Sequence, residues 1–287
     1  MKNKFLSLVA LSVLLVSCSK DDNNSTVASS QLKLNLTGLE NLGANYKYEG
    51  WIVVNGAPVT TGVFTVNDAG VLSKTTFDVD ATSLAAATKF VLSIEPANDA
   101  DPAPSNTKYL VADFSGNSAT ISTGIIGNFA ASAGKYLIAS PTSMSSMDPL
   151  AGVWFMDVSG PSNGFDLPTL ETGWQYEGWV VKNGTPLSTG KFSNPSISDL
   201  NASYSGTQPA PPFPGEDFVA NAPAGITFPW DLSGATLVIS VEPNPDNSAM
   251  PFTLKPLSHI VASPAVEGAT VSMTRSLSSF PTGTVTR

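Results

Sequence analysis

The chain has 287 residues, a formal net charge of −9 and only 13% charged residues. An acidic chain without a basic cluster is not expected to bind nucleic acid, because binding to phosphates depends on Lys and Arg. Gly and Pro are plentiful, at 23 and 22 residues, and short apolar runs alternate with turn-forming residues. This pattern indicates an all-β protein, and the length is sufficient for two domains, each with its own core.

Residues 1–17 are predicted to be a lipoprotein signal peptide. Lys2 and Lys4 precede an apolar run that is too short to anchor the chain in a bilayer. The run closes on residues 15–18 (Leu-Val-Ser-Cys), which resemble the lipobox of bacterial lipoproteins. The resemblance implies cleavage before Cys18 and acylation of this single cysteine, and several acyl chains would hold the protein firmly on a membrane. An ordinary signal peptide with an incidental cysteine is the alternative.

Residues 18–30 are expected to form a flexible, polar tether. Residues 19–22 (Ser-Lys-Asp-Asp) resemble the short charged export tag that follows the lipidated cysteine in surface lipoproteins of Bacteroidota. A solvated tether with no export role is the alternative. We therefore predict a cell-envelope location, as an outer-membrane lipoprotein that contacts the membrane through the lipid on Cys18 and that the tag would place on the cell surface.

One motif occurs twice in the rest of the chain. Residues 48–58 read YEGWIVVNGAP, and residues 176–186 read YEGWVVKNGTP. Each copy continues into Thr-Gly-x-Phe, ending at Phe64 in the first and at Phe192 in the second. Asn-Gly favours a tight turn, so the apolar runs on either side of it predict a β-hairpin in each copy. Two such similar stretches indicate a duplicated structural unit.

The two hairpins carry a tryptophan at the same place. Side chains alternate between the faces of a strand, so Trp51 shares a face with Val53, and Trp179 shares one with Val181. We predict that these are the core faces, because a Trp buries on the order of 200 Å², a large share of a small core. A role as a ligand platform is the alternative.

The match extends along the whole of both units. Residues 90–96 (FVLSIEP) correspond to residues 237–243 (LVISVEP), and each run predicts a strand that ends at its proline. Residues 134–142 are expected to form the strand that closes the first unit. We therefore predict two tandem β-sandwich domains of immunoglobulin-like type, over residues 31–148 and 149–287.

The second unit is longer than the first between Phe192 and Glu242. The additional residues include a Pro-rich run at 208–215 and several aromatic residues. A semi-rigid segment of this kind can present a binding surface or lie against the sandwich as a cover. If it binds a ligand, the candidate surface consists of Tyr204, Phe213, Phe218, Phe228 and Trp230.

Both units share an ordered series of short motifs: aromatic-x-x-Trp, Asn-Gly-x-Pro, Gly-x-Phe, and a strand ending in Glu-Pro. Over residues 31–287 this series resembles the extracytoplasmic C-terminal domain of anti-sigma-K factors. The resemblance implies a sensor-type β-sandwich module in each unit. An anti-sigma factor also needs a sigma-binding domain and a transmembrane helix, and the sequence shows neither, so direct contact with a sigma factor is not expected.

No catalytic residues are predicted. Nucleophilic catalysis usually pairs Ser or Cys with His, and the chain has one histidine, His259, in a strand-like context. A zinc site would need several His or Cys ligands. Glu49 and Glu95 recur as Glu177 and Glu242, once per unit, and we interpret them as architectural. A glutamate before the proline at a strand end is expected to accept hydrogen bonds from loop amides.

Oxygen-rich turns follow both Glu-Pro pairs. Their side chains could bind calcium, but the spacing matches no EF-hand and ordinary polar turns have the same composition. Neither a metal nor a cofactor is therefore predicted. The residues concerned are Asn98, Asp99, Asp101, Asn244, Asp246 and Asn247.

These observations predict a lipid-anchored, non-catalytic protein of the cell envelope that binds or senses an unknown protein or glycan ligand. The alternative is a surface adhesin or glycan-binding lipoprotein that uses the aromatic residues between 201 and 230. A hydrolase with an unfamiliar site is the least favoured interpretation.

Overall fold

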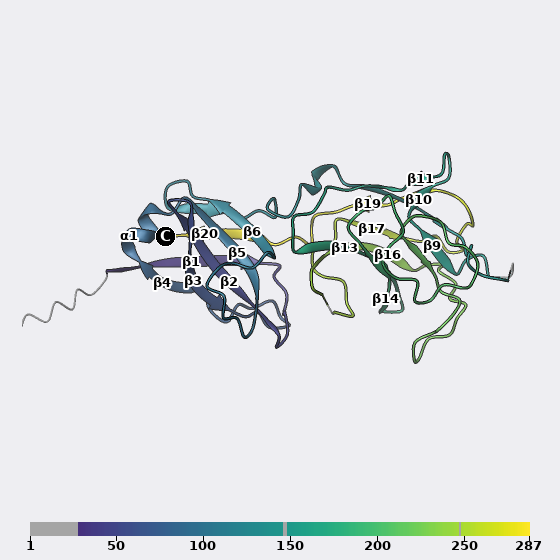
Figure 1. Ribbon diagram of the computed structural model, residues 1–287, viewed down its shortest axis with the longest axis horizontal. Coiled ribbons are helices and arrows are strands. Elements are labelled where there is room, and N and C mark those ends of the chain that lie inside the picture. Colours follow the sequence, from purple (N-terminus) through teal and green to yellow (C-terminus); the bar gives the residue numbers. More distant parts are fainter. Residues whose placement is uncertain (1–27, 146–147, 247) are drawn as a thin grey trace, which may run out of the picture.

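The computed structural model describes residues 28–145, 148–246 and 248–287. It shows an all-β protein with two lobes, each built from packed antiparallel sheets (Figure 1). The predicted all-β, β-sandwich fold class is confirmed. The predicted signal peptide and the lipid attachment at Cys18 lie outside the described residues. Within the described ranges, no helix has the length and apolar character needed to cross a bilayer.

The first sandwich packs the sheet β4-β1-β20-β7 against the sheet β3-β2-β5-β6. Alternate leucines of β1, beginning at Leu32, point into the core and meet Tyr48 and Ile52 of β2. A short helix, α1 (Ala81–Ala86), is capped by Asp80, whose side chain accepts a hydrogen bond from the Ser83 amide. The strands are β1 (Ser29–Thr37), β2 (Tyr46–Val54), β3 (Ala57–Phe64), β4 (Thr76–Asp80), β5 (Lys89–Pro96), β6 (Lys108–Asp113), β7 (Ser118–Thr120) and β20 (Thr282–Thr286).

The second sandwich repeats this plan. One sheet has the order β14-β13-β16-β17-β19, and the other has the order β12-β8-β9-β15, with β18 also pairing with β8. Strands β10 and β11 form a separate two-stranded ribbon. The elements are η1 (Phe129–Ala131), β8 (Ala133–Ile138), β9 (Gly152–Trp154), β10 (Met156–Asp157), β11 (Ser162–Asn163), β12 (Phe165–Asp166), β13 (Trp174–Lys182), β14 (Thr185–Phe192), β15 (Gly215–Asp217), β16 (Thr236–Pro243), β17 (Leu257–Ile260), β18 (Val271–Ser272) and β19 (Thr274–Arg275).

Each copy of the motif forms the predicted hairpin, β2–β3 in the first sandwich and β13–β14 in the second. Asn55 and Gly56 have φ of 51° and 81°, and Asn183 and Gly184 have φ of 52° and 78°. Positive φ at both central residues is the geometry of a type I′ turn, which matches the twist of paired strands. The proline after each turn falls on β3 or β14, and both are edge strands, where a proline breaks no interior ladder.

The glycine before each tryptophan marks a β-bulge. The register of both hairpins shifts directly after Gly50 and directly after Gly178. A Cβ on Gly50 would lie 2.5 Å from Thr61 Oγ1, and one on Gly178 would lie 2.2 Å from Thr189 Oγ1. Because the neighbouring edge strand approaches this closely, a larger residue would force the strands apart.

The prediction that the tryptophans face the core is wrong. Tyr48 and Ile52, on the opposite face of β2, are fully buried in the core between the sheets. Trp51 and Trp179 are buried as well, but they lie outside that core, on the outer faces of their sheets. Both faces of these strands carry large side chains, so alternation alone does not identify the inner one. The outer face of each of these two sheets therefore also carries a buried side chain.

The last strand of each unit belongs to the other sandwich. β8, at the end of the first unit, pairs with β9 and β18 of the second. β20, at the end of the second unit, lies between β1 and β7 of the first. The strand expected at 134–142 therefore forms, but it closes the second sandwich and not the first. Each strand carries a fully or almost fully buried apolar residue, Tyr136 in β8 and Val285 in β20, and lies between two partner strands of the sandwich that it joins.

Candidate binding site between the two sandwiches

An aromatic contact joins the two sandwiches. Tyr109 on β6 is fully buried, and its ring centroid lies 5.5 Å from those of Trp174 and Phe252 in the second sandwich. The indole Nε1 of Trp174 donates a hydrogen bond of 3.0 Å to the carbonyl oxygen of Lys108. Together with the exchanged strands, this contact places the two sandwiches side by side (Figure 1).

A cavity of about 350 Å³ lies at this junction. Residues 40–46 of the first sandwich line one side, and Phe252 and the loop after β16 line the other. Leu42 and Ile94 form apolar parts of the cavity wall, and Glu40 and Asp246 contribute carboxyl groups to it. A concave site with apolar walls and a few polar groups is the usual form of a small-ligand site. Both units are needed to form it.

Glu40 is the most perturbed acid on the cavity wall. Burial raises its pKa to about 7, although the Thr253 amide and the nearby Lys255 favour the charged form. The Thr253 N–H donates a hydrogen bond of 2.7 Å to Glu40 Oε2, so this carboxyl also ties the sandwiches together. A poorly solvated carboxylate favours a ligand that brings a positive charge or a hydrogen-bond donor.

Glu40 also predicts a pH dependence of stability. Its carboxyl binds a proton more tightly in the folded chain (pKa about 7) than in the unfolded chain, where it has the ordinary glutamate pKa of 4.5. The favourable contribution is therefore complete below pH 4.5 and is lost as the pH rises through 7. Between pH 5 and pH 8 the free energy of unfolding should therefore fall by about 1–3 kcal/mol less in Glu40→Gln than in the wild type.

Urea unfolding at pH 5, 6, 7 and 8 measures this difference. Glu171→Gln is the matched control, because it makes the same substitution at an exposed position. Parallel profiles for the wild type and Glu40→Gln would show that Glu40 ionises without a burial penalty.

The structure brings four of the five predicted surface aromatics together in one cluster. Phe218 is fully buried, and the rings of Tyr204, Phe228 and Trp230 pack on it with centroids 5.6–5.9 Å away. Phe213 is partly buried and lies elsewhere on the loop. None of the five lines the junction cavity. Phe218 belongs to the main hydrophobic core, and the other three rings extend that core beneath the surface of the insertion.

Buried acids anchor this insertion to the sandwich. Asp217 on β15 accepts hydrogen bonds from the amide and the hydroxyl of Thr142, at 2.7 and 2.5 Å, and from the indole of Trp154 at 2.8 Å. Glu216 accepts one from the Tyr204 amide, and burial raises its pKa to about 7. These contacts favour the insertion as a cover over the sandwich.

A buried chain of hydrogen bonds recurs on the outer face of each sandwich. In the first, the indole of Trp51 donates to Ser93 at 2.8 Å, Ser93 donates to Glu95, and Glu95 also accepts from the Ser105 amide at 2.9 Å. The glutamate before the proline thus accepts from a loop amide, which confirms the prediction. The same chain in the second sandwich consists of Trp179, Ser240, Glu242 and the Phe252 amide.

His259 lies on β17 and packs against the exchanged strand. Its Nδ1 is 2.9 Å from the hydroxyl of Tyr136, and the two ring centroids are 5.6 Å apart. This contact uses the imidazole for packing and for a hydrogen bond within the sandwich, on the strand that the sequence indicated. Sequence reasoning missed the junction residues Glu40 and Phe252, because nothing in their local pattern indicates that two units meet there.

The chain matches no protein-family model, and comparison with curated proteins and with solved structures gives no significant match. The resemblance of the two units to the extracytoplasmic domain of anti-sigma-K factors therefore stays a prediction.

Proposed function

We propose that this chain is a lipid-anchored, non-catalytic binding protein of the cell envelope, and that it holds its ligand in the junction cavity. The observation that carries the proposal is the cavity of about 350 Å³ with walls from both units. The proposed anchor is the lipid on Cys18, supported by the lipobox-like residues 15–18. Incorporation of a labelled fatty acid by the wild type, and its loss in Cys18→Ser, tests the anchor.

The walls suggest the chemistry of the ligand. Glu40 is an acid whose charged form is disfavoured by burial, and Ile94 and Phe252 supply apolar surface beside it. A small molecule or peptide end with an amine and an apolar body would compensate the carboxylate and bury its own apolar part. Signalling by such a protein would require a separate membrane-spanning partner.

Filling the cavity should abolish binding. Ala44 is exposed and lines the cavity, so Ala44→Trp would occupy it without disturbing either core. A thermal-shift panel of spermidine, arginine-containing dipeptides and neutral sugars provides the probes. We expect at least one amine to raise the melting temperature of the wild type and to leave that of Ala44→Trp unchanged.

Ala222→Trp is the matched control, because it places the same side chain at an exposed position on the insertion. It should respond to the amine as the wild type does. Equal shifts of the melting temperature in the wild type and Ala44→Trp would place binding outside the cavity. If only sugars shift the melting temperature and Ala222→Trp removes that shift, the glycan-binding alternative is supported instead.

A further inference from the structure

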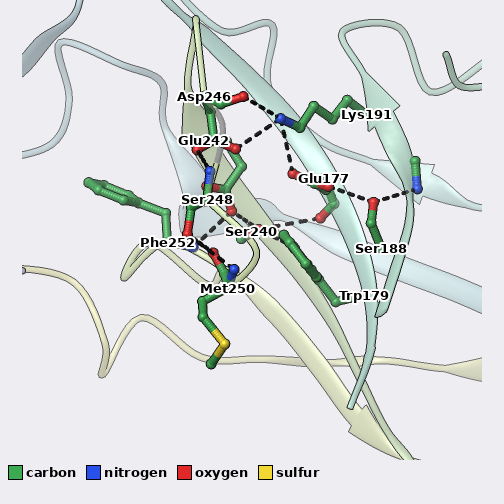
Figure 2. Close-up of polar contacts among 11 residues, drawn as sticks. Glu177, Trp179, Ser188, Lys191, Ser240, Glu242, Asp246, Ser248, Met250 and Phe252 are labelled. Carbon is green, nitrogen blue, oxygen red and sulfur yellow. Dashed lines mark hydrogen bonds and ion pairs between the residues drawn. The ribbon is translucent and has the colours of Figure 1, made fainter. Parts of the chain in front are cut away.

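Three acids converge on the outer face of the second sandwich. Glu177 comes from β13, Glu242 from the end of β16, and Asp246 from the loop that follows (Figure 2). One carboxylate oxygen from each lies within 4.8 Å of the other two. The exposed fractions of Glu177 and Glu242 are 3% and 0%. This cluster belongs to the same hydrogen-bonded layer as Trp179, and Asp246 also borders the junction cavity.

Two oxygens of the cluster lack hydrogen-bond partners. Glu242 uses Oε1 to accept from Ser240 and from the Phe252 amide, and Glu177 uses Oε1 to accept from Ser188 at 2.5 Å. Neither Oε2 atom has a hydrogen-bond partner, although both are buried. A buried carboxylate oxygen without a hydrogen-bond donor is costly, so Glu242 Oε2 lacks a partner, and Glu177 Oε2 has only an ammonium at 3.7 Å, beyond hydrogen-bonding distance.

Lys191 is the cation closest to these acids. Its ammonium lies 2.9 Å from Asp246 Oδ2, 2.8 Å from the Asp246 carbonyl oxygen and 3.7 Å from Glu177 Oε2. One ammonium therefore contacts two of the three carboxyl groups, and the third, that of Glu242, lies within 4.8 Å of them without a cation of its own. The lysine side chain is 21% exposed, so it reaches the cluster from the solvent side and can swing outward.

The first sandwich supplies an internal comparison. Its corresponding residues are Glu49, Glu95 and Asp99, and Val63 stands where the second unit has Lys191. There the Ser105 N–H donates to both carboxylate oxygens of Glu95, at 2.9 and 3.2 Å. Among the described residues, only the second unit therefore combines a three-acid cluster with open buried oxygens.

We propose that Glu177, Glu242 and Asp246 form a binding site for a hard divalent cation of the Ca²⁺ type, at the position that the Lys191 ammonium borders. All the available ligands are oxygens: the two open carboxylate atoms, Asp246 Oδ2 and the Asp246 carbonyl oxygen. Carboxylate and carbonyl oxygens are the ligands of Ca²⁺, and a site completed by water fits the weaker, extracellular range of affinity. A bound divalent cation brings two positive charges to the acids where the Lys191 ammonium brings one, and Lys191 then turns to solvent.

Terbium luminescence tests the site directly. Tb³⁺ substitutes for Ca²⁺, and the indole of Trp179 is linked to Glu242 through Ser240, close enough to sensitise the emission. With the purified, chelator-treated full chain, we expect saturable emission that Ca²⁺ competes away. Glu242→Gln should weaken the affinity at least about tenfold. Lys191→Met should strengthen it, because it removes the competing ammonium.

Glu95→Gln is the matched control, because it makes the same change at the corresponding position of the first sandwich. It should bind Tb³⁺ as the wild type does, and circular dichroism checks that all variants are folded. Asp246→Asn provides a second ligand variant if Glu242→Gln does not fold. The proposal is overturned if wild type and Lys191→Met give no saturable emission, or if Glu95→Gln weakens binding as much as Glu242→Gln does. The outcome does not depend on the ligand proposed for the junction cavity.

Discussion

Removal of residues 282–287 is expected to unfold the first sandwich, although these residues end the second unit. Val285 is fully buried, and in the register of the sheet it lies between Leu34 of β1 and Ala119 of β7. The Arg287 guanidinium donates to carbonyl oxygens on the α1 side of the sandwich and lies over the ring of Phe114 at 4.5 Å. Without β20, β1 and β7 lose their shared partner. The expected loss is on the order of 5 kcal/mol or more, comparable to the whole stability of a small domain.

Hydrogen exchange measured by mass spectrometry would locate this effect. Amides of β1 and β7 should lose protection in the truncated chain, while those of β13 and β16 should retain most of theirs. A point variant, Val285→Asp, should act in the same way, because it buries a charge in the core. Thr286→Asp is its control, since the next side chain is exposed. Protected β1 and β7 amides in the truncated chain would mean that the first sandwich closes without β20.

Local features of this fold could be predicted from the sequence because they depend on neighbouring residues. The Asn-Gly turns at Asn55 and Asn183 require positive φ, and the chain there has the residues that adopt it. The Glu-Pro strand ends also follow a local rule: Glu95 and Glu242 both accept from amides about ten residues onward, Ser105 and Phe252.

The features that could not be predicted depend on long-range choices. Tyr136 and Val285 occupy equivalent closing strands, and either strand could have closed its own unit by pattern alone. The junction cavity follows from that exchange and from the contact between Tyr109 and Trp174, so no stretch of sequence encodes it. The acid cluster brings Lys191 together with acids from three segments of the chain. Matching the two repeats identifies these residues as equivalents of residues in the first unit, but it does not show that they meet in space.

Phe218→Ala is expected to lower the free energy of unfolding by about 3–5 kcal/mol, the range for a fully buried phenylalanine. The side chain is 0% exposed, and its ring contacts Tyr204, Phe228 and Trp230. Truncation would leave a cavity at the centre of the aromatic cluster, and the anchored ends of the insertion would prevent its collapse. Urea unfolding measures the loss.

Phe213→Ala makes the same truncation on the same loop, where the ring is partly buried and outside the cluster. It should cost less than about 1 kcal/mol. The comparison separates the two interpretations of the insertion, because a cover needs Phe218 for stability whereas a free binding surface does not. Similar small losses for both variants would mean that the aromatic cluster is loosely packed, and would return the five residues to the role of a ligand surface. A large loss confined to Phe218→Ala would mean that the additional residues of the second unit form a folded layer. The junction cavity would then be the better place to look for a ligand.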